Sequence, residues 1–90
     1  MKPVAMKQIV TKHVAVHWFA AYREAVGFAA EPVQTDADTA AELFQEMLSR
    51  HTALAAYQRA LVAINDEMVA WTSPVQDGDR VLFFPPVAGG

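Results

Sequence analysis

The most constraining feature of the sequence is one clear amphipathic helix, predicted to begin after Thr39. Thr39 and Glu42 have the spacing of a capping box, in which the hydroxyl accepts from the amide three residues on and the carboxylate reaches back. Arg50 falls in the last turn, where the helix dipole favours a cation. The apolar residues recur at helical spacing and form one face to be buried: Ala40, Leu43, Phe44, Met47 and Leu48.

Before this helix, the sequence predicts a strand, a short helical turn and a second strand. Residues 9–20 carry β-branched and aromatic residues in partial alternation, as a strand does. Residues 21–26 suit a helical turn that ends at Gly27, a residue typical of left-handed C-caps. Residues 31–35 suit a short strand, which Pro32 confines to a sheet edge or a strand start. Alternation in the first strand separates two sets of side chains: Val14, Val16 and Trp18 on one face, and His13, Ala15, His17 and Phe19 on the other.

After the helix, three further strands are predicted. Residues 53–60 suit another helical turn, and residues 61–64 and 68–71 suit a hairpin joined by a turn at 65–67. The last strand is predicted at 80–84. With a right-handed crossover, this order predicts an α+β roll: a mixed sheet of four to five strands with one main helix packed on one face. Two acidic residues flank a glycine before the last strand, and turn chemistry explains them better than a metal site: Asp77 and Asp79.

Composition excludes several classes of function. Ninety residues and 9.9 kDa allow one small domain. The chain has no cysteine, which excludes a disulfide framework, a thiolate metal site and a cysteine nucleophile. A net charge of −3 argues against a nucleic-acid groove. No apolar run approaches the roughly 20 residues of a membrane span, and no apolar segment of a secretory signal follows Met1, so we expect a cytoplasmic protein.

The C-terminal end differs physically from the rest of the chain. Two consecutive prolines, Pro85 and Pro86, cannot donate ladder hydrogen bonds, so the sheet is predicted to stop at Phe84. The chain then ends in Gly89 and Gly90, which have no side chains to fix their conformation. We therefore expect one domain over residues 1–84 and a projecting tail over residues 85–90. Such a tail can thread a narrow channel and present a terminal carboxylate to another protein.

Three segments resemble one known family. They are Trp18–Gly27, Val62–Asn65 and Asp77–Gly90, with the patterns FAxxRExxG and DGDxVxFFPPVxGG. These residues resemble the MoaD/ThiS family of ubiquitin-like sulfur carriers, which includes the small subunit of molybdopterin synthase. The similarity covers residues 14–90. Residues 1–13 look like an N-terminal extension: either Met6 is the start, or residues 8–13 lengthen the first strand.

The resemblance implies a β-grasp (ubiquitin-like) fold, with the last strand beside the first in the middle of the sheet. It also implies chemistry at Gly90, with Gly89 beside it: an E1-like enzyme would use ATP to adenylate the terminal carboxylate, and a sulfur donor would convert it to a thiocarboxylate. The sulfur would pass to cyclic pyranopterin monophosphate to form the dithiolene of molybdopterin. The chain itself would hold no permanent cofactor. An ionised terminal carboxylate is a poor electrophile, which is why activation is needed.

The implied partners are the large subunit of molybdopterin synthase, in a heterotetramer, and the E1-like enzyme. An exposed apolar patch usually marks an interface. Phe83 and Phe84 point to opposite sheet faces, and we take Phe84 as the outward one. The predicted partner-binding residues are Phe19, Met68, Phe84, Pro85, Pro86 and Val87. The helix could instead cover this face.

Three other functions stay open. The thiamine branch of the family also ends in Gly-Gly, but its members are usually shorter and lack the Phe-Phe-Pro-Pro run. A ubiquitin-like protein modifier would share the activation step and differ only in its acceptor. A plain interaction module would have an idle tail.

Overall fold

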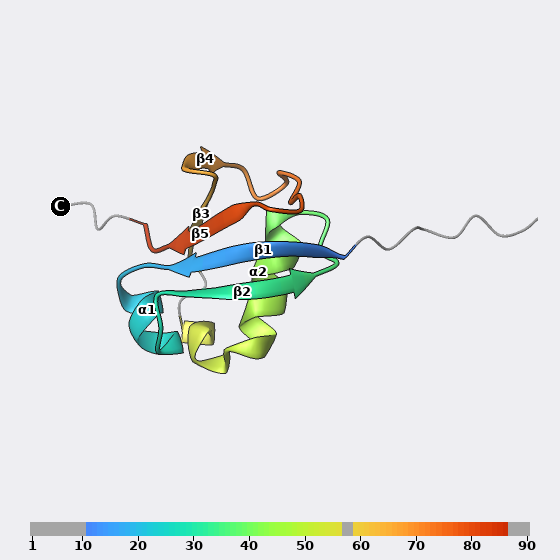
Figure 1. Ribbon diagram of the computed structural model, residues 1–90. Coiled ribbons are helices and arrows are strands. Elements are labelled where there is room, and N and C mark those ends of the chain that lie inside the picture. The colour runs from blue at the N-terminus through green and yellow to red at the C-terminus, as the bar shows by residue number, and fades with distance from the viewer. Residues whose placement is uncertain (1–10, 57–58, 87–90) are drawn as a thin grey trace, which may run out of the picture.

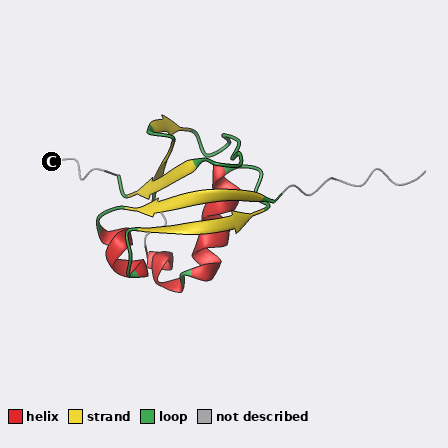
Figure 2. Ribbon diagram, in the orientation of Figure 1, coloured by secondary structure: helices red, strands yellow, loops and turns green. Residues whose placement is uncertain are grey.

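The computed structural model describes residues 11–56 and 59–86, which form one mixed sheet with helices on one side (Figures 1 and 2). The five strands lie in the order β2-β1-β5-β3-β4. β5 runs parallel to β1, and the other neighbouring pairs are antiparallel. The elements are β1 (Lys12–Trp18), α1 (Ala21–Val26), β2 (Ala30–Thr35), α2 (Ala40–Arg50), the 3-10 helix η1 (Thr52–Ala56), β3 (Leu61–Ile64), β4 (Glu67–Val69) and β5 (Arg80–Phe84). The α+β prediction and the central place of the last strand are confirmed.

The core lies between α2 and one face of the sheet. Alternation in β1 buries Val14, Val16 and Trp18, as predicted. Phe83 of β5 is fully buried, and its ring lies 4.9 Å from that of Phe44 of α2, centroid to centroid. α2 therefore covers this face of the sheet and leaves the other face open.

Hydrogen bonds of two kinds, from capping side chains and from a neighbouring loop, hold the start of α2. The Thr39 hydroxyl accepts a hydrogen bond from the Glu42 amide (3.2 Å), as the capping box predicted. The Glu42 carboxylate, however, accepts from the amide of Asp38 (2.9 Å) rather than from that of Thr39. Carbonyls of the segment after β4 accept from the first two helical amides: Ser73 from Ala40 and Trp71 from Ala41. The helix amides that would otherwise lack partners are thus satisfied from the neighbouring loop.

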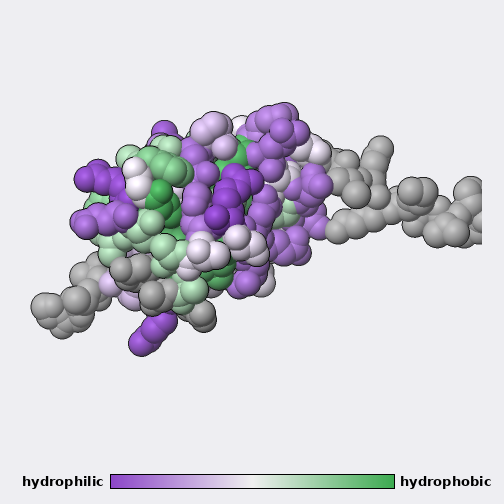
Figure 3. Space-filling view, turned by 90° about the horizontal axis from the view of Figure 1, so that it is seen from below, coloured by the Kyte–Doolittle hydropathy of each residue, from purple (hydrophilic) through white to green (hydrophobic). Residues whose placement is uncertain are grey.

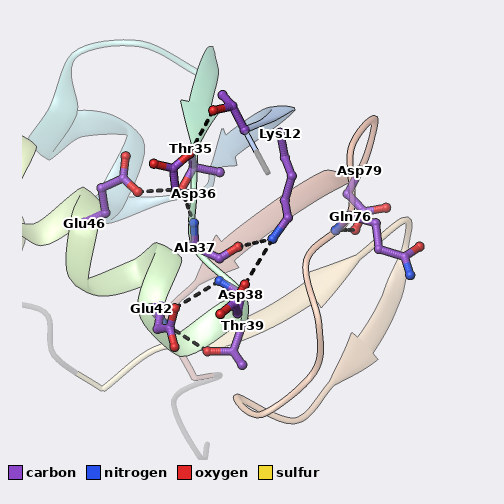
Figure 4. A network of polar contacts seen from close by, with 11 residues as sticks. Lys12, Thr35, Asp36, Ala37, Asp38, Thr39, Glu42, Glu46, Gln76 and Asp79 are labelled. Carbon is purple, nitrogen blue, oxygen red and sulfur yellow. Dashed lines mark hydrogen bonds and ion pairs between the residues drawn. The ribbon is translucent and has the colours of Figure 1, made fainter. Parts of the chain in front are cut away.

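A polar network joins β1 and β2 to α2 and to the turn before it (Figure 4). The buried Thr35 donates to the Glu46 carboxylate (2.5 Å) and accepts from the Ala37 amide (3.0 Å). The Lys12 ammonium donates to the Ala37 carbonyl. These contacts fix the turn between the edge strand and the main helix.

Pro32 lies in β2, which is an edge strand of the sheet, and pairs with Ala15 of β1. This confirms the edge position that the proline predicted. Gly27 ends α1 with φ 95°, in the left-handed region, also as predicted. The first strand spans Lys12–Trp18, with Thr11 outside it, and residues 9–10 of the prediction lie outside the described residues. The strand ends two residues earlier than predicted, because Ala20 turns into α1 with φ 55°.

The predicted hairpin is shifted by one residue. Asn65 (φ 53°) and Asp66 (φ 73°) form a two-residue turn with both residues at positive φ, so β4 begins at Glu67. The strand predicted at 68–71 ends at Val69, because Trp71 leaves the sheet to stack on Phe83, with ring planes 10° apart. Of the helical turn predicted over residues 53–60, η1 confirms residues 53–56, whereas residues 59–60 are not helical and residues 57–58 lie outside the described residues. Within the described residues, no helix is long and apolar enough to cross a membrane.

Candidate functional site

The chain leaves the domain from the middle of the sheet. β5 is the central strand and runs parallel to β1. The two strands therefore finish side by side at the same end of the sheet, where Trp18 pairs with Phe83. Pro85 is half-buried and Pro86 is exposed. The predicted reactive residues, Gly89 and Gly90, lie outside the described residues, as does Val87. The described part of the chain therefore determines where the tail begins.

The sheet face that α2 does not cover, here called the open face, carries an apolar patch. Phe83 points into the core, and Phe84 is half-buried on the open face. Met68 is 62% exposed and Phe19 is 60% exposed. Phe19 directly follows Trp18, so it lies level with Phe84 at the ends of two neighbouring strands. The structure thus leaves Phe19 and Met68 exposed and Phe84 partly accessible, and their role in partner binding stays a prediction.

Strand register extends this patch to residues that the sequence analysis missed. Phe84 pairs with Leu61 of β3, and Leu82 pairs with Ala63. Leu61 and Leu82 are both half-buried and face outward: Leu82 lies between buried Val81 and Phe83, and Leu61 starts β3 before buried Val62. Ala63 in turn pairs with Met68. Period-two alternation in the sequence could have indicated that Leu82 faces outward. That these residues form one continuous patch is apparent only when β3 is known to lie beside β5.

Polar groups border the patch at the far end of β5. The Arg80 guanidinium pairs with the Asp66 carboxylate of the β3–β4 turn. Asp79 is buried and accepts from the Asn65 side chain (2.9 Å) and the Gln76 amide (2.8 Å). The Asp77 carboxylate accepts from the His13 amide (2.6 Å). Both of these aspartates therefore stabilise the connection into β5, as turn chemistry predicted.

A second polar cluster, partly buried, lies on the helix side. The Glu31 carboxylate accepts from the Trp18 indole (2.9 Å) and lies 2.7 Å from a His51 ring nitrogen. Arg50 lies 3.6 Å from the same carboxylate. This cluster joins β1, β2 and the end of α2 and is remote from the open face.

Seen from below, apolar residues gather in the half of the molecule nearer the end of β5, and hydrophilic residues dominate the other half (Figure 3).

Comparison with known proteins gives two curated relatives over most of the chain. The chain is 41% identical over 80 residues to the molybdopterin synthase sulfur carrier subunit of Escherichia coli K12, covering 86% of this chain and 99% of the relative. It is 37% identical over 78 residues to the protein of the same name from Haemophilus influenzae, covering 83% of this chain and 96% of the relative.

Solved structures share the same fold. Small archaeal modifier protein 1 from Haloferax volcanii has a TM-score of 0.75 at 27% identity, over 84% of this chain and 99% of that one. Subunits 1 and 2 of the molybdopterin-converting factor from Helicobacter pylori were solved as a complex, matched with a TM-score of 0.63 at 25% identity, over 87% of this chain and 99% of that one. Ubiquitin from Caldiarchaeum subterraneum matches with a TM-score of 0.59 at 10% identity, over 90% of this chain and 100% of that one.

The sheet order, the single main helix and these neighbours define a ubiquitin-like β-grasp protein, so the predicted fold is confirmed. The ThiS family model matches residues 16–90, which include the terminal Gly-Gly. The chain belongs to the ThiS family.

Proposed function

We propose that this chain is the sulfur carrier subunit of a molybdopterin synthase. The observation that carries the proposal is the similarity to two curated sulfur carrier subunits, together with a family match that runs through Gly90. The fold supports it, because central strand β5 ends at Phe84 and is followed by two prolines, which cannot donate ladder hydrogen bonds and so cannot continue the sheet. The proposed reactive group is the Gly90 carboxylate.

The proposed reaction proceeds in three steps. An E1-like enzyme joins the Gly90 carboxylate to AMP from ATP, with release of pyrophosphate. Sulfide-level sulfur from a sulfur donor then attacks the acyl carbon, displaces AMP and leaves a thiocarboxylate. The thiocarboxylate sulfur forms a carbon–sulfur bond to cyclic pyranopterin monophosphate in place of one of its carbon–oxygen bonds, and the displaced oxygen leaves as water or stays on the phosphate. Water then hydrolyses the resulting thioester, which releases the Gly90 carboxylate and leaves the sulfur on the pterin, and two such transfers give the dithiolene. An α-carboxyl has an ordinary pKa of about 3.5 and is ionised at pH 7, so activation supplies the leaving group that it lacks.

In this proposal the open face binds the partners and the tail reaches their chemistry. The Helicobacter pylori neighbour was solved as a complex of two subunits, which supports a large-subunit partner for this chain. The patch that carries Phe84, Leu61 and Met68 is continuous with the start of the tail. We propose that the large synthase subunit binds there, in a heterotetramer, and that the E1-like enzyme uses the same face. ATP belongs to that enzyme, and the chain carries only sulfur.

A second candidate is a ubiquitin-like protein modifier, favoured by the similarity to a small archaeal modifier protein. It shares the activation of Gly90 but transfers the chain to lysines of target proteins. A carrier for thiamine synthesis would likewise differ only in the acceptor. The acceptor of the sulfur or of the chain therefore distinguishes these functions.

Reconstitution tests the proposal. The chain with a Gly90 thiocarboxylate, the large synthase subunit and cyclic pyranopterin monophosphate should yield the dithiolene product, detected as its oxidised fluorescent derivative. The same chain without Gly90 is the matched control and should give no product. Isopeptide adducts on many cellular proteins, with no sulfur transferred to the pterin, would replace the proposal with the modifier function.

A further inference from the structure

A small pocket opens on the open face beside the apolar patch. It has a volume of about 100 Å³ and is lined by His17, Ala63, Asp66, Arg80 and Leu82. Strand register explains its position, because Leu82 of β5 pairs with His17 of β1 on one side and Ala63 of β3 on the other. The pocket is thus part of the sheet surface itself.

The size of the pocket indicates what can occupy it. Small-molecule sites usually measure roughly 300–1,000 Å³, and this pocket is far smaller. Its volume suits one amino-acid side chain. Leu82 and Phe84 are two residues apart on β5 and face the same way, so the pocket adjoins the proposed docking patch. The occupant is therefore expected to come from the protein that docks on this face.

The chemistry of the walls favours a carboxylate. Arg80 presents a guanidinium with five N–H donors, and His17 adds a ring that can donate. Within residues 11–56 and 59–86, the side-chain partner of this guanidinium is Asp66, whose side chain is 79% exposed. Leu82 and Ala63 supply apolar surface. A glutamate or aspartate side chain suits both the apolar and the charged wall of the pocket. Its aliphatic carbons would contact the apolar surface, and its carboxylate would contact the guanidinium.

Hydrogen bonds to Asn65 hold the backbone of Arg80 in place. Its amide donates to the Asn65 side chain (2.9 Å), and its carbonyl accepts from the Asn65 amide (2.8 Å). The Asn65 side chain also donates to Asp79, which is buried. A site whose backbone is already ordered loses less conformational entropy on binding.

We propose that this pocket receives one glutamate or aspartate side chain from the large synthase subunit that docks on the open face, and that Arg80 thereby selects this partner. The inference rests on the proposed function and deepens it. Arginine and carboxylate form two parallel hydrogen bonds, which give geometric specificity that an apolar patch alone lacks.

The test measures binding of the cognate large synthase subunit by titration calorimetry. Arg80→Gln and Arg50→Gln each remove one positive charge, but Arg50 lies at the end of α2, on the other side of the sheet. We expect Arg80→Gln to raise Kd about ten-fold or more, as for loss of a charged hydrogen bond, and Arg50→Gln to leave it unchanged. Asp66→Asn removes the competing carboxylate and should leave Kd equal or lower. Thermal melting should show that all three variants fold.

Charge reversal identifies the occupant. Arg80→Glu should bind poorly, and changing one carboxylate of the large subunit to lysine should restore binding to this variant alone. Equal affinity of Arg80→Gln and the unaltered chain would overturn the inference and leave the proposed function intact. A loss with Asp66→Asn as large as that with Arg80→Gln, or the lack of any rescuing carboxylate, would overturn it too. Failure of the unaltered chain to bind would overturn both.

Discussion

Trp18 and Phe83 pair across the parallel strands β1 and β5, with ring centroids 5.6 Å apart. This contact joins the first strand to the last in the centre of the sheet. Each of these residues is followed by an aromatic residue that is not buried in the core: Phe19 after Trp18, and Phe84 after Phe83. Packing in the core therefore fixes the position from which the docking patch and the tail begin.

Truncation of Phe83 should destabilise the domain strongly. Phe83→Ala removes a fully buried ring that contacts Trp18, Phe44 and Trp71, and we expect it to cost about 3–5 kcal/mol of unfolding free energy. Urea unfolding measures this loss. The control is Met68→Ala, an exposed apolar truncation that should change stability by less than about 0.5 kcal/mol. Similar losses in both variants would contradict the assigned core.

Removal of the Glu31 carboxylate should destabilise the junction of β1, β2 and α2. Glu31→Leu leaves the Trp18 indole N–H and the His51 ring without their acceptor, and we expect a loss of about 1–3 kcal/mol. Glu24→Leu, at an exposed position of α1, is the matched control and should be nearly neutral. Thermal unfolding followed by circular dichroism compares the two. No difference between them would mean that the cluster contributes nothing to stability.

Charge on the docking patch should weaken partner binding more than folding. Phe84→Glu and Leu61→Glu place a carboxylate on neighbouring strands of the open face, and each should raise the Kd for the large subunit at least ten-fold. Phe28→Glu alters another exposed aromatic residue, one that packs on His51 instead, and should leave binding unchanged. Unfolding of the Phe84 variant would instead assign that ring to the core.

Extension of the C-terminus should abolish function without affecting the fold. A tag that follows Gly90 removes the free carboxylate, so the proposed adenylation has no substrate. The tagged chain should melt at the same temperature as the untagged chain and fail to restore molybdenum-cofactor synthesis in cells that lack their own carrier. Restoration by an untrimmed tagged chain, verified by mass spectrometry, would exclude chemistry at Gly90.

Local patterns predicted most of the fold. The capping residue Thr39, the C-cap Gly27 and the edge proline Pro32 act within a few residues of the chain, and the structure confirms each. One long-range contact explains the strand end that was missed: Trp71 leaves the predicted strand because its ring stacks on Phe83. The other difference is local, because the turn before α2 brings the Asp38 amide, four residues earlier, within reach of the Glu42 carboxylate.

In the candidate site, too, local patterns identified some residues, and others depended on which strands are neighbours. Phe84 was identified from alternation along one strand. Leu61 and the pocket of Arg80 and His17 were not identified, because they depend on which strands are neighbours. Gly90 was identified from the chain end and from a family resemblance, and its position lies outside the described residues.

The central claim is that Gly90 carries sulfur. Intact-mass spectrometry after incubation with an E1-like activating enzyme, ATP and a sulfur donor tests it most directly. We predict a mass gain equal to the replacement of one oxygen by one sulfur, located at Gly90 by fragmentation and absent when ATP is omitted. An unchanged mass, with several activating enzymes that each modify a known carrier in parallel, would contradict the claim.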